Sequence, residues 1–207
     1  MLLIARHHES EWNKLGEWTG SRDVHLTEYG FEMSGEMGQL ISGIHIDRAF
    51  ASMQVRSIET LSSMLMALGQ YDVPTEHAAA LDERDYGDYT GKNKWQMEKI
   101  LGEGRFEGIR RGWDVPIPHG ETLKMVYDRA VPYYLQHIVP ALAGGANVLV
   151  VSHGNVIRAL MKYIEGISDE GIEGVEMLFG AVVLYDVDAA GHSLKKEVRS
   201  VASTVNA

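Results

Sequence analysis

Short apolar runs alternate along the chain with longer segments that carry apolar side chains at helical spacing. The runs have the length of buried strands and lie at residues 2–5, 48–52, 147–151 and 182–186. Helical spacing marks residues 57–68, 123–142 and 155–164. Strands that alternate with helices predict an α/β layer structure with a mainly parallel central sheet. Pro132 and Pro140 weaken the helix prediction in the segments that contain them.

The ends of two predicted strands carry histidines. His7 follows the first apolar run closely, and His153 follows the run at residues 147–151. Parallel strands bring their carboxyl ends to the same edge of a sheet, where α/β proteins bind their ligands. We therefore expect His7 and His153 to lie close together on one rim, although they are far apart in the sequence.

Composition predicts one domain over residues 1–207. The chain is 45% hydrophobic and 23% charged, and no internal repeat, low-complexity run or linker divides it. There are no cysteines, which excludes disulfides, thiolate metal sites and cysteine nucleophiles. The stretch before Arg6 has too few apolar residues for a signal sequence or a membrane span, so we expect a cytoplasmic protein.

The chain is acidic, with a formal net charge of -10. This charge repels nucleic acid and anionic membranes, so we expect neither as a partner. An anionic ligand would have to be held by a local basic cluster.

Arg6 and His7 begin a polar segment directly after the first apolar run. Neutral imidazole is a nucleophile toward phosphorus, and nearby guanidinium groups favour the neutral ring and neutralise a transferring phosphoryl group. Arg6 and Arg56 are candidates for that role, Arg56 because it leads into a predicted helix whose first amides add positive potential. For a single histidine the ordinary interpretation is a structural or solvated side chain, and it holds for His25, His45, His77, His137 and His192.

Two further segments could complete a phosphate site. Residues 81–94 are polar, aromatic and punctuated by glycine, as in a functional loop, and Glu83 within them could donate and reclaim a proton. The alternative for Glu83 is a charged turn that pairs with its own arginine. Arg110 and Arg111 form an adjacent basic pair, and two guanidinium groups can clamp a small dianion or a carboxylate.

These residues resemble the motifs of the 2,3-bisphosphoglycerate-dependent phosphoglycerate mutases, within the histidine phosphatase superfamily, over nearly the whole chain. The matching motifs are Arg6-His7-x-Glu9-Ser10-x-Trp12-Asn13, Thr19-Gly20, Ser52 with Arg56 and Thr60, Glu83-Arg84-x-Tyr86-Gly87, Gly91-x-Asn93-Lys94, Arg110-Arg111, Gly120-Glu121-Thr122-Leu123, and His153-Gly154-Asn155 with Arg158. The first motif alone is typical of the superfamily, which is mostly phosphatases. The segment from Glu83 to Lys94 and the arginine pair resemble the mutase branch.

The resemblance implies a three-layer α/β/α fold and an enzyme that interconverts 3-phosphoglycerate and 2-phosphoglycerate through a phosphohistidine. By this resemblance His7 is the nucleophile, Glu83 is the general acid and base, and 2,3-bisphosphoglycerate is the primer, with no metal. Arg6, Arg56, His153 and the Gly154 amide would surround the transferring phosphoryl group. The substrate-binding residues would be Ser10, Asn13, Thr19, Gly20, Tyr86, Lys94, Arg110, Arg111, Gly154 and Asn155. The implied partner is a small phosphorylated metabolite, and the chain could form a homodimer.

Several positions depart from the family's pattern. His8 stands where the family has a glycine that permits close backbone approach, so we expect its ring to disturb the fit of a phosphate. Ser21 replaces a tryptophan, Val156 replaces a serine, and the segment 177–180 lacks the expected Pro-Thr-Gly. These changes leave the proposed chemical core intact and alter the residues that support it.

Two segments are shorter than in many members of the family. The chain runs from Arg111 to Gly120 without a long insert, which could alter contacts between subunits. The segment after Val187 is also brief. In the family this segment helps to close the site, so a brief one implies weak closure, which would let water compete with the substrate.

Three alternatives to the mutase remain open. The same nucleophile could pass its phosphoryl group to water, as in a phosphomonoesterase. The departures around the site could instead indicate a protein that binds phosphorylated metabolites or a protein partner without catalysis. His7, His153 and Glu83 could also surround a metal ion, but the neighbouring arginines would oppose a cation.

Overall fold

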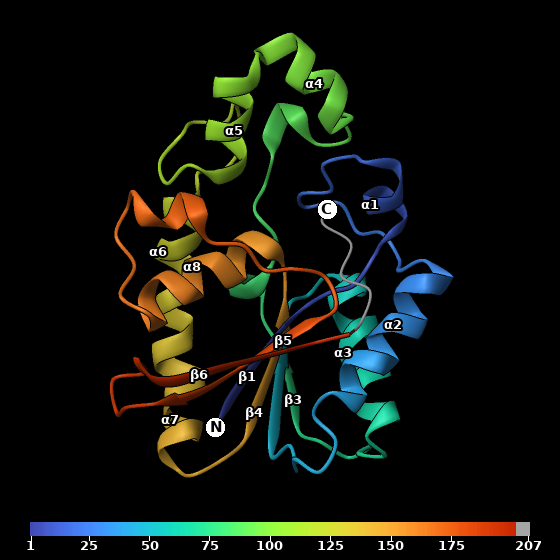
Figure 1. Ribbon diagram of the computed structural model, residues 1–207, viewed down its shortest axis with the longest axis vertical. Coiled ribbons are helices and arrows are strands. Elements are labelled where there is room, and N and C mark those ends of the chain that lie inside the picture. The colour runs from blue at the N-terminus through green and yellow to red at the C-terminus, as the bar shows by residue number, and fades with distance from the viewer. Residues whose placement is uncertain (202–207) are drawn as a thin grey trace.

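The computed structural model describes residues 1–201, in which six strands form one sheet with helices on both faces (Figure 1). The strands are β1 (Leu2–Arg6), β2 (Arg48–Ala51), β3 (Thr75–His77), β4 (Val148–Ser152), β5 (Ala181–Val187) and β6 (Ser193–Ser200). The α-helices are α1 (Glu11–Leu15), α2 (Glu28–Gln39), α3 (Val55–Ala67), α4 (Lys94–Leu101), α5 (Glu103–Arg111), α6 (Leu123–Tyr133), α7 (Val139–Ala143) and α8 (Gly154–Ile164). Short 3-10 turns lie at Ala79–Leu81, Gly87–Tyr89 and Gly171–Gly174.

The sheet is mainly parallel, as predicted. Its strand order is β3-β2-β4-β1-β5-β6, and the first four strands of this order run parallel. The other two strands, β5 and β6, extend the sheet in antiparallel pairing. Both central strands β1 and β4 are almost wholly buried, which explains why each is a continuous apolar run in the sequence.

Helices cover each face of the sheet and complete the predicted three layers. On one face, Val126 of α6 and Leu160 of α8 share a core with Val150 of β4. On the other face, Met64 of α3 packs in a second core with Leu149 of β4. Figure 1 shows α6, α7 and α8 on one side of the sheet and α2 and α3 on the opposite side.

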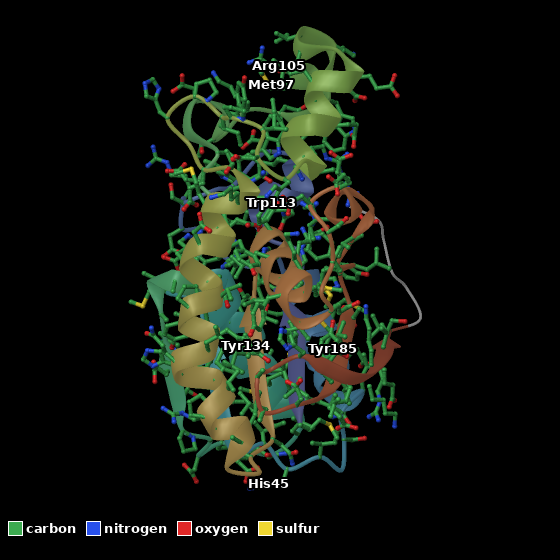
Figure 2. The ribbon with its side chains drawn as sticks, turned by 90° about the vertical axis from the view of Figure 1, so that its left-hand side faces the viewer. His45, Met97, Arg105, Trp113, Tyr134 and Tyr185 are labelled. Carbon is green, nitrogen blue, oxygen red and sulfur yellow. The ribbon has the colours of Figure 1, made fainter. Side chains whose placement is uncertain are left out.

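Helices α4 and α5 lie beyond the carboxyl edge of the parallel strands (Figure 1). A third core holds them there, in which Trp18, Tyr86, Phe106 and Ile109 are buried. Figure 2 shows Met97 and Arg105 at this end of the molecule, with His45 at the opposite end. The two helices and the strand ends therefore face each other across the region where the functional loops gather.

The helix α2 was not predicted, because its buried face is made mostly of small residues, with Met37 as the one large side chain among them. Gly30, Ser34 and Gly38 are buried, whereas the large side chain of Phe31 is exposed. A Cβ atom on Gly38 would lie 2.6 Å from the carbonyl oxygen of Met64, so α2 and α3 pack backbone against backbone. Such a contact gives no apolar stripe in the sequence.

The segment 123–142 is helical but not uniform. After α6 it continues as a π-helical turn at Tyr134–Ile138 and then as α7. Pro132 lies inside α6 and has no N–H to donate, which favours a local change in the hydrogen-bond pattern. Pro140 is tolerated because it lies in the first turn of α7.

The segment after Val187 forms β6 at the edge of the sheet. The end of this segment, residues 202–207, lies outside the described residues. In residues 1–201 no helix is both long enough and apolar enough to cross a membrane.

Candidate active site

Parallel pairing of β1 with β4 places His7 beside His153. Arg6 is in register with Ser152, and the His7 amide donates to the Ser152 carbonyl at 2.9 Å. His7 and His153 come directly after this pair of residues, and the centroids of their imidazole rings are 4.9 Å apart. The predicted proximity of the two histidines is confirmed.

The ring of His7 is held in one tautomer. Its Nδ1 atom lies 2.7 Å from the carbonyl oxygen of His8, which can only accept, so Nδ1 carries the hydrogen. The other nitrogen, Nε2, keeps its lone pair. Burial, with Arg56 and Arg6 nearby, lowers the pKa of His7 well below 6.5. At neutral pH the ring is therefore uncharged, with the lone pair of Nε2 available.

His153 lies fully buried against His7. Its Nε2 atom is 2.7 Å from the hydroxyl oxygen of Ser52, at the end of β2. Burial and the charge of Arg56 lower the pKa of His153 well below 6.5. Both rings are thus neutral, and Ser52 fixes the orientation of the second one.

The half-buried Arg6 and the fully buried Arg56 flank the histidines. Arg6 donates to the carbonyl of Met177 at 3.1 Å, and its guanidinium lies 3.8 Å from the centre of the Phe179 ring. Arg56, in the first turn of α3, donates to the carbonyl of Gly20 at 3.1 Å. Burial lowers the pKa of Arg56 to about 10, so it stays charged at neutral pH.

The N-terminus of α8 contributes backbone amides to the same place. The helix starts at Gly154, and the side chain of His153 does not cap it. Amides of an uncapped first turn attract anions, with help from the helix dipole. A Cβ atom on Gly154 would lie 3.5 Å from the guanidinium carbon of Arg6, so the two positions are in contact.

These groups open onto a cavity of about 100 Å³. Its lining includes the predicted residues Arg6, His7, Asn13, Thr19, Gly20, Arg56, Glu83, Tyr86, Lys94, Arg110, Arg111, Gly154 and Asn155. His153 lies behind His7, and Ser10 caps α1 and accepts a hydrogen bond from the amide of Asn13. The structure thus brings together thirteen predicted residues in one wall, and Ser10 and His153 support two of them.

A hydrogen-bonded group holds Glu83 at the cavity. The Asn155 amide nitrogen donates to Glu83 Oε1 at 3.2 Å and to the Tyr86 hydroxyl at 3.0 Å. The backbone amide of Arg84 donates to the same carboxylate oxygen at 2.8 Å. Trp18 stacks on Tyr86 with ring centroids 5.3 Å apart. These contacts leave the carboxylate with a defined position on the wall.

A second basic group comes from α4 and α5. Lys94 is the first residue of α4, and Arg110 and Arg111 end α5. Burial and the charges of Arg6 and Arg110 lower the pKa of Lys94 to about 8. The cavity therefore has cations both at the sheet edge and on the helices that face it.

Arg158 is a lining residue to which the sequence analysis gave no role. Its guanidinium donates to the carbonyls of Arg110 at 3.2 Å and Arg111 at 2.6 Å, and so holds the end of α5. The sequence does contain a signal for this role, because Arg158 lies between apolar residues of a predicted helix. An arginine in such a place is a buried charge that needs partners. Glu17 and Glu176 also line the cavity, and nothing in the sequence pattern indicates them.

The ring of His8 is not part of the lining of the cavity beside His7, which we call the phosphate cavity because several cations line it. It is 3% exposed and lies with its centroid 5.5 Å from the ring of Tyr29 and 5.5 Å from that of Phe179. The ring lines a second cavity, which we call the His8 cavity, together with Tyr29, Trp95, Phe106 and Phe179. The side chain that replaces the family's glycine thus takes no part in the wall around His7.

The metal alternative finds no support in the described part of the chain. Among residues 1–201, no group of three or more histidine, cysteine, aspartate or glutamate side chains could hold a metal ion. The neighbours of His7 and His153 are the cations Arg6 and Arg56 instead.

Comparison with known proteins agrees with this geometry. The family model of the histidine phosphatase superfamily (branch 1) matches residues 2–198. The chain is 39% identical over 200 residues to a 2,3-bisphosphoglycerate-dependent phosphoglycerate mutase of Parvibaculum lavamentivorans, covering 96% of this chain and 95% of the relative.

Solved structures of a mutase and of a phosphatase share the fold. A phosphoglycerate mutase from Bacillus anthracis matches with a TM-score of 0.76 at 24% identity, over 97% of this chain and 91% of the other. A mycobacterial glucosyl-3-phosphoglycerate phosphatase matches with a TM-score of 0.76 at 18% identity, over 96% of each chain. Both likenesses show the fold alone. With its family match and its mutase relative, the chain belongs to branch 1 of the histidine phosphatase superfamily.

Proposed function

We propose that the protein is a phosphoglycerate mutase that interconverts 3-phosphoglycerate and 2-phosphoglycerate, with His7 as the residue that carries the phosphoryl group. The observation that carries the proposal is a neutral histidine in a cavity with cations at both ends. A phosphomonoesterase needs cations only around the reacting phosphate. A mutase must also hold a second anionic group of the same substrate, and the mutase relative supports this reading.

The primer fits the same two sets of cations. 2,3-Bisphosphoglycerate has two phosphates and a carboxylate, and it would supply the phosphoryl group that loads His7. Arg6, Arg56 and the amide of Gly154 would hold the reacting phosphate, and the basic side chains of α4 and α5 would hold the other anions. Arg110 and Arg111 pair with Glu107 and Glu176 in the protein alone, so these carboxylates compete with the ligand.

The chemistry of each step follows from the chain's own groups. Nε2 of His7 forms a bond to phosphorus as the phosphorus–oxygen bond of the ester breaks, and Glu83 gives a proton to the leaving oxygen. Arg6 and Arg56 neutralise the charge on the transferring oxygens. Glu83 removes the proton from an attacking substrate hydroxyl and returns it in the reverse direction. Because anions can be held at both ends of the cavity, either oxygen of the glycerate can be presented to His7. No metal is needed for these steps.

The proposal also covers the location and the partners of the enzyme. We expect it to act in the cytoplasm on phosphoglycerates, without nucleic acid or membrane as a partner. A homodimer stays a prediction that light scattering on the purified protein tests.

The test is conversion of 3-phosphoglycerate to 2-phosphoglycerate with and without 2,3-bisphosphoglycerate, with free phosphate followed in the same samples. The parent protein is compared with His7→Ala and with His25→Ala, which alters an exposed histidine. We expect primer-dependent conversion in the parent and in His25→Ala, and none in His7→Ala. Added EDTA should leave the rate unchanged.

The same experiment separates the alternatives. Release of phosphate faster than isomerisation, in a manner that needs His7, would identify a phosphomonoesterase. Failure of both products, together with measurable binding of 3-phosphoglycerate, would identify a protein that binds without catalysis.

A further inference from the structure

The His8 cavity is larger and more aromatic than the phosphate cavity. Its volume is about 430 Å³, within the roughly 300–1,000 Å³ of small-molecule pockets. Its aromatic wall is formed by Tyr29, Trp95, Phe106 and Phe179 beside His8. Flat aromatic side chains are suited to stack on a flat aromatic ligand.

His8 contributes its ring to this wall as an apolar surface. Both ring nitrogens are buried without accessible surface, and neither has a partner within residues 1–201, so an occupant of the cavity meets the rest of the ring. Burial lowers the pKa of His8 to about 4, so the ring is uncharged at neutral pH.

The charges around the cavity are balanced. Its lining contains the carboxylates Glu9, Glu98 and Glu107 and the cations Lys14, Lys94 and Arg110. Three charges of each sign favour neither a strongly anionic nor a strongly cationic group. The occupant that matches the wall is a neutral aromatic ring.

The His8 cavity adjoins the phosphate cavity. Asn13, Lys94 and Arg110 line both of them. Phe179 joins the two as well, since its ring lies against Arg6 of the phosphate site and its centroid is 5.5 Å from that of His8. A ligand held by its phosphate at His7 can therefore extend past these side chains into the aromatic wall.

We propose that the His8 cavity binds the neutral aromatic group of a phosphomonoester whose phosphate lies against His7. The proposal rests on the nucleophile of the proposed function and adds a class of substrate to it. His8 and Phe179 are two departures from the family's pattern, and both belong to this one wall. The cavity therefore gives a joint role to residues that the mutase reaction does not use.

The reaction of such an ester balances with groups already present. Nε2 of His7 forms a bond to phosphorus as the bond to the aryl oxygen breaks, and Glu83 gives its proton to the leaving oxygen. Water then attacks phosphorus, gives a proton to Glu83 and breaks the phosphorus–nitrogen bond. The products are a phenol-type alcohol and inorganic phosphate.

Calorimetric binding of two phosphonates to the full chain tests the subsite without any turnover. Benzylphosphonate and methylphosphonate share the anionic group, so their affinity ratio reports the aromatic group alone. We expect benzylphosphonate to bind at least about tenfold more tightly, because it buries apolar surface in the aromatic wall. Trp95→Ala should reduce this ratio, whereas Ile100→Ala, an exposed position on the same helix, should not.

A second variant tests His8. His8→Ala removes one ring from the aromatic wall, so it should reduce the ratio of the benzylphosphonate and methylphosphonate affinities. Its affinity for methylphosphonate should stay that of the parent, which also shows that the variant is folded.

Three results would overturn the subsite. One is equal affinity for benzylphosphonate and methylphosphonate. Another is an aromatic preference that survives both Trp95→Ala and His8→Ala. The third is a preference that appears only when the chain is ended at Val201, since residues 202–207 would then be the natural occupant. If neither phosphonate binds, the subsite fails too, and primer-dependent isomerisation in the same preparation shows whether the proposed function fails with it.

Discussion

The Nδ1 atom of His7 lies 2.7 Å from the carbonyl oxygen of His8, and this contact decides which ring nitrogen keeps its lone pair. A carbonyl oxygen only accepts, so the hydrogen stays on Nδ1 and Nε2 is the nitrogen available as the proposed nucleophile. The bond uses the backbone of residue 8 and not its ring. The replacement of glycine by His8 therefore leaves this contact available.

We predict that the phosphoenzyme formed with 2,3-bisphosphoglycerate carries its phosphoryl group on Nε2 of His7. Phosphorus NMR of the denatured phosphoenzyme distinguishes the two ring positions. His7→Gln should give no phosphoenzyme and should reduce isomerisation by at least about 10⁴-fold, as removal of a covalent nucleophile does. A phosphoryl group on Nδ1 would contradict the tautomer inferred from the structure.

Glu83→Gln should reduce the rate of isomerisation by about 10²- to 10⁴-fold, the usual share of a general acid and base. The amide keeps an oxygen that can accept from Asn155 and from the Arg84 amide, so the wall should stay in place. Rapid-mixing measurements should show slow transfer to the substrate hydroxyl with nearly unchanged KM. A rate within threefold of the parent would assign proton transfer to another group.

The alkaline limb of the pH profile should report Lys94. Its pKa of about 8 means that the ammonium is present below that pH and lost above it. The substrate phosphate is already dianionic there, because its second pKa is near 6. We expect kcat/KM for 3-phosphoglycerate to fall by up to about tenfold per pH unit above pH about 8.

Two variants of neighbouring lysines identify the group behind that limb. Lys94→Arg should move the limb beyond the measurable range, because arginine stays protonated. The exposed Lys92→Arg should keep the parent's profile. An unchanged limb in Lys94→Arg would assign the titration elsewhere.

Arg158→Met should weaken substrate binding and stability together. Arg158 donates to the carbonyls of Arg110, Arg111, Val175 and Ile172, and the variant leaves these oxygens without that donor. We expect a loss of at least about 2 kcal/mol in the free energy of unfolding, measured with urea. KM for 3-phosphoglycerate should rise more than kcat falls, because the arginine pair on α5 loses its support.

The control for Arg158→Met is Arg105→Met, which removes an exposed arginine from α5 itself. It should change the free energy of unfolding by less than about 0.5 kcal/mol. Equal effects of the two substitutions would show that Arg158 does not hold α5 in place.

The sequence predicts the part of the site that depends on strand ends. His7 and His153 follow apolar runs that have the length of buried strands, and parallel pairing of such strands brings the two histidines together. The second basic group was predicted in a different way, from the motif that contains Arg110 and Arg111. Its position opposite the sheet edge depends on packing of α4 and α5 that no periodic pattern encodes.

Other features depend on contacts that have no signature in the sequence. The small residues Gly30 and Gly38 give α2 no apolar stripe, although they allow it to approach α3 closely. Glu176 reaches the cavity from a segment between α8 and β5, and only its pairing with Arg111 explains its place there. The direction of the His8 ring is set by the backbone at the end of β1, and the sequence shows only that a bulky residue has replaced a glycine.

The position of β1 between β4 and β5 has a consequence for how the protein is made. During synthesis β1 is made before both of its partners, and it can pair only after residues 148–187 have been made; closing so long a loop is slow. Until then the apolar segment at residues 2–6 stays unpaired in the nascent chain. Because the same pairing joins His7 to His153, catalytic activity measures completed folding, and a chain that stops before β4 should have none.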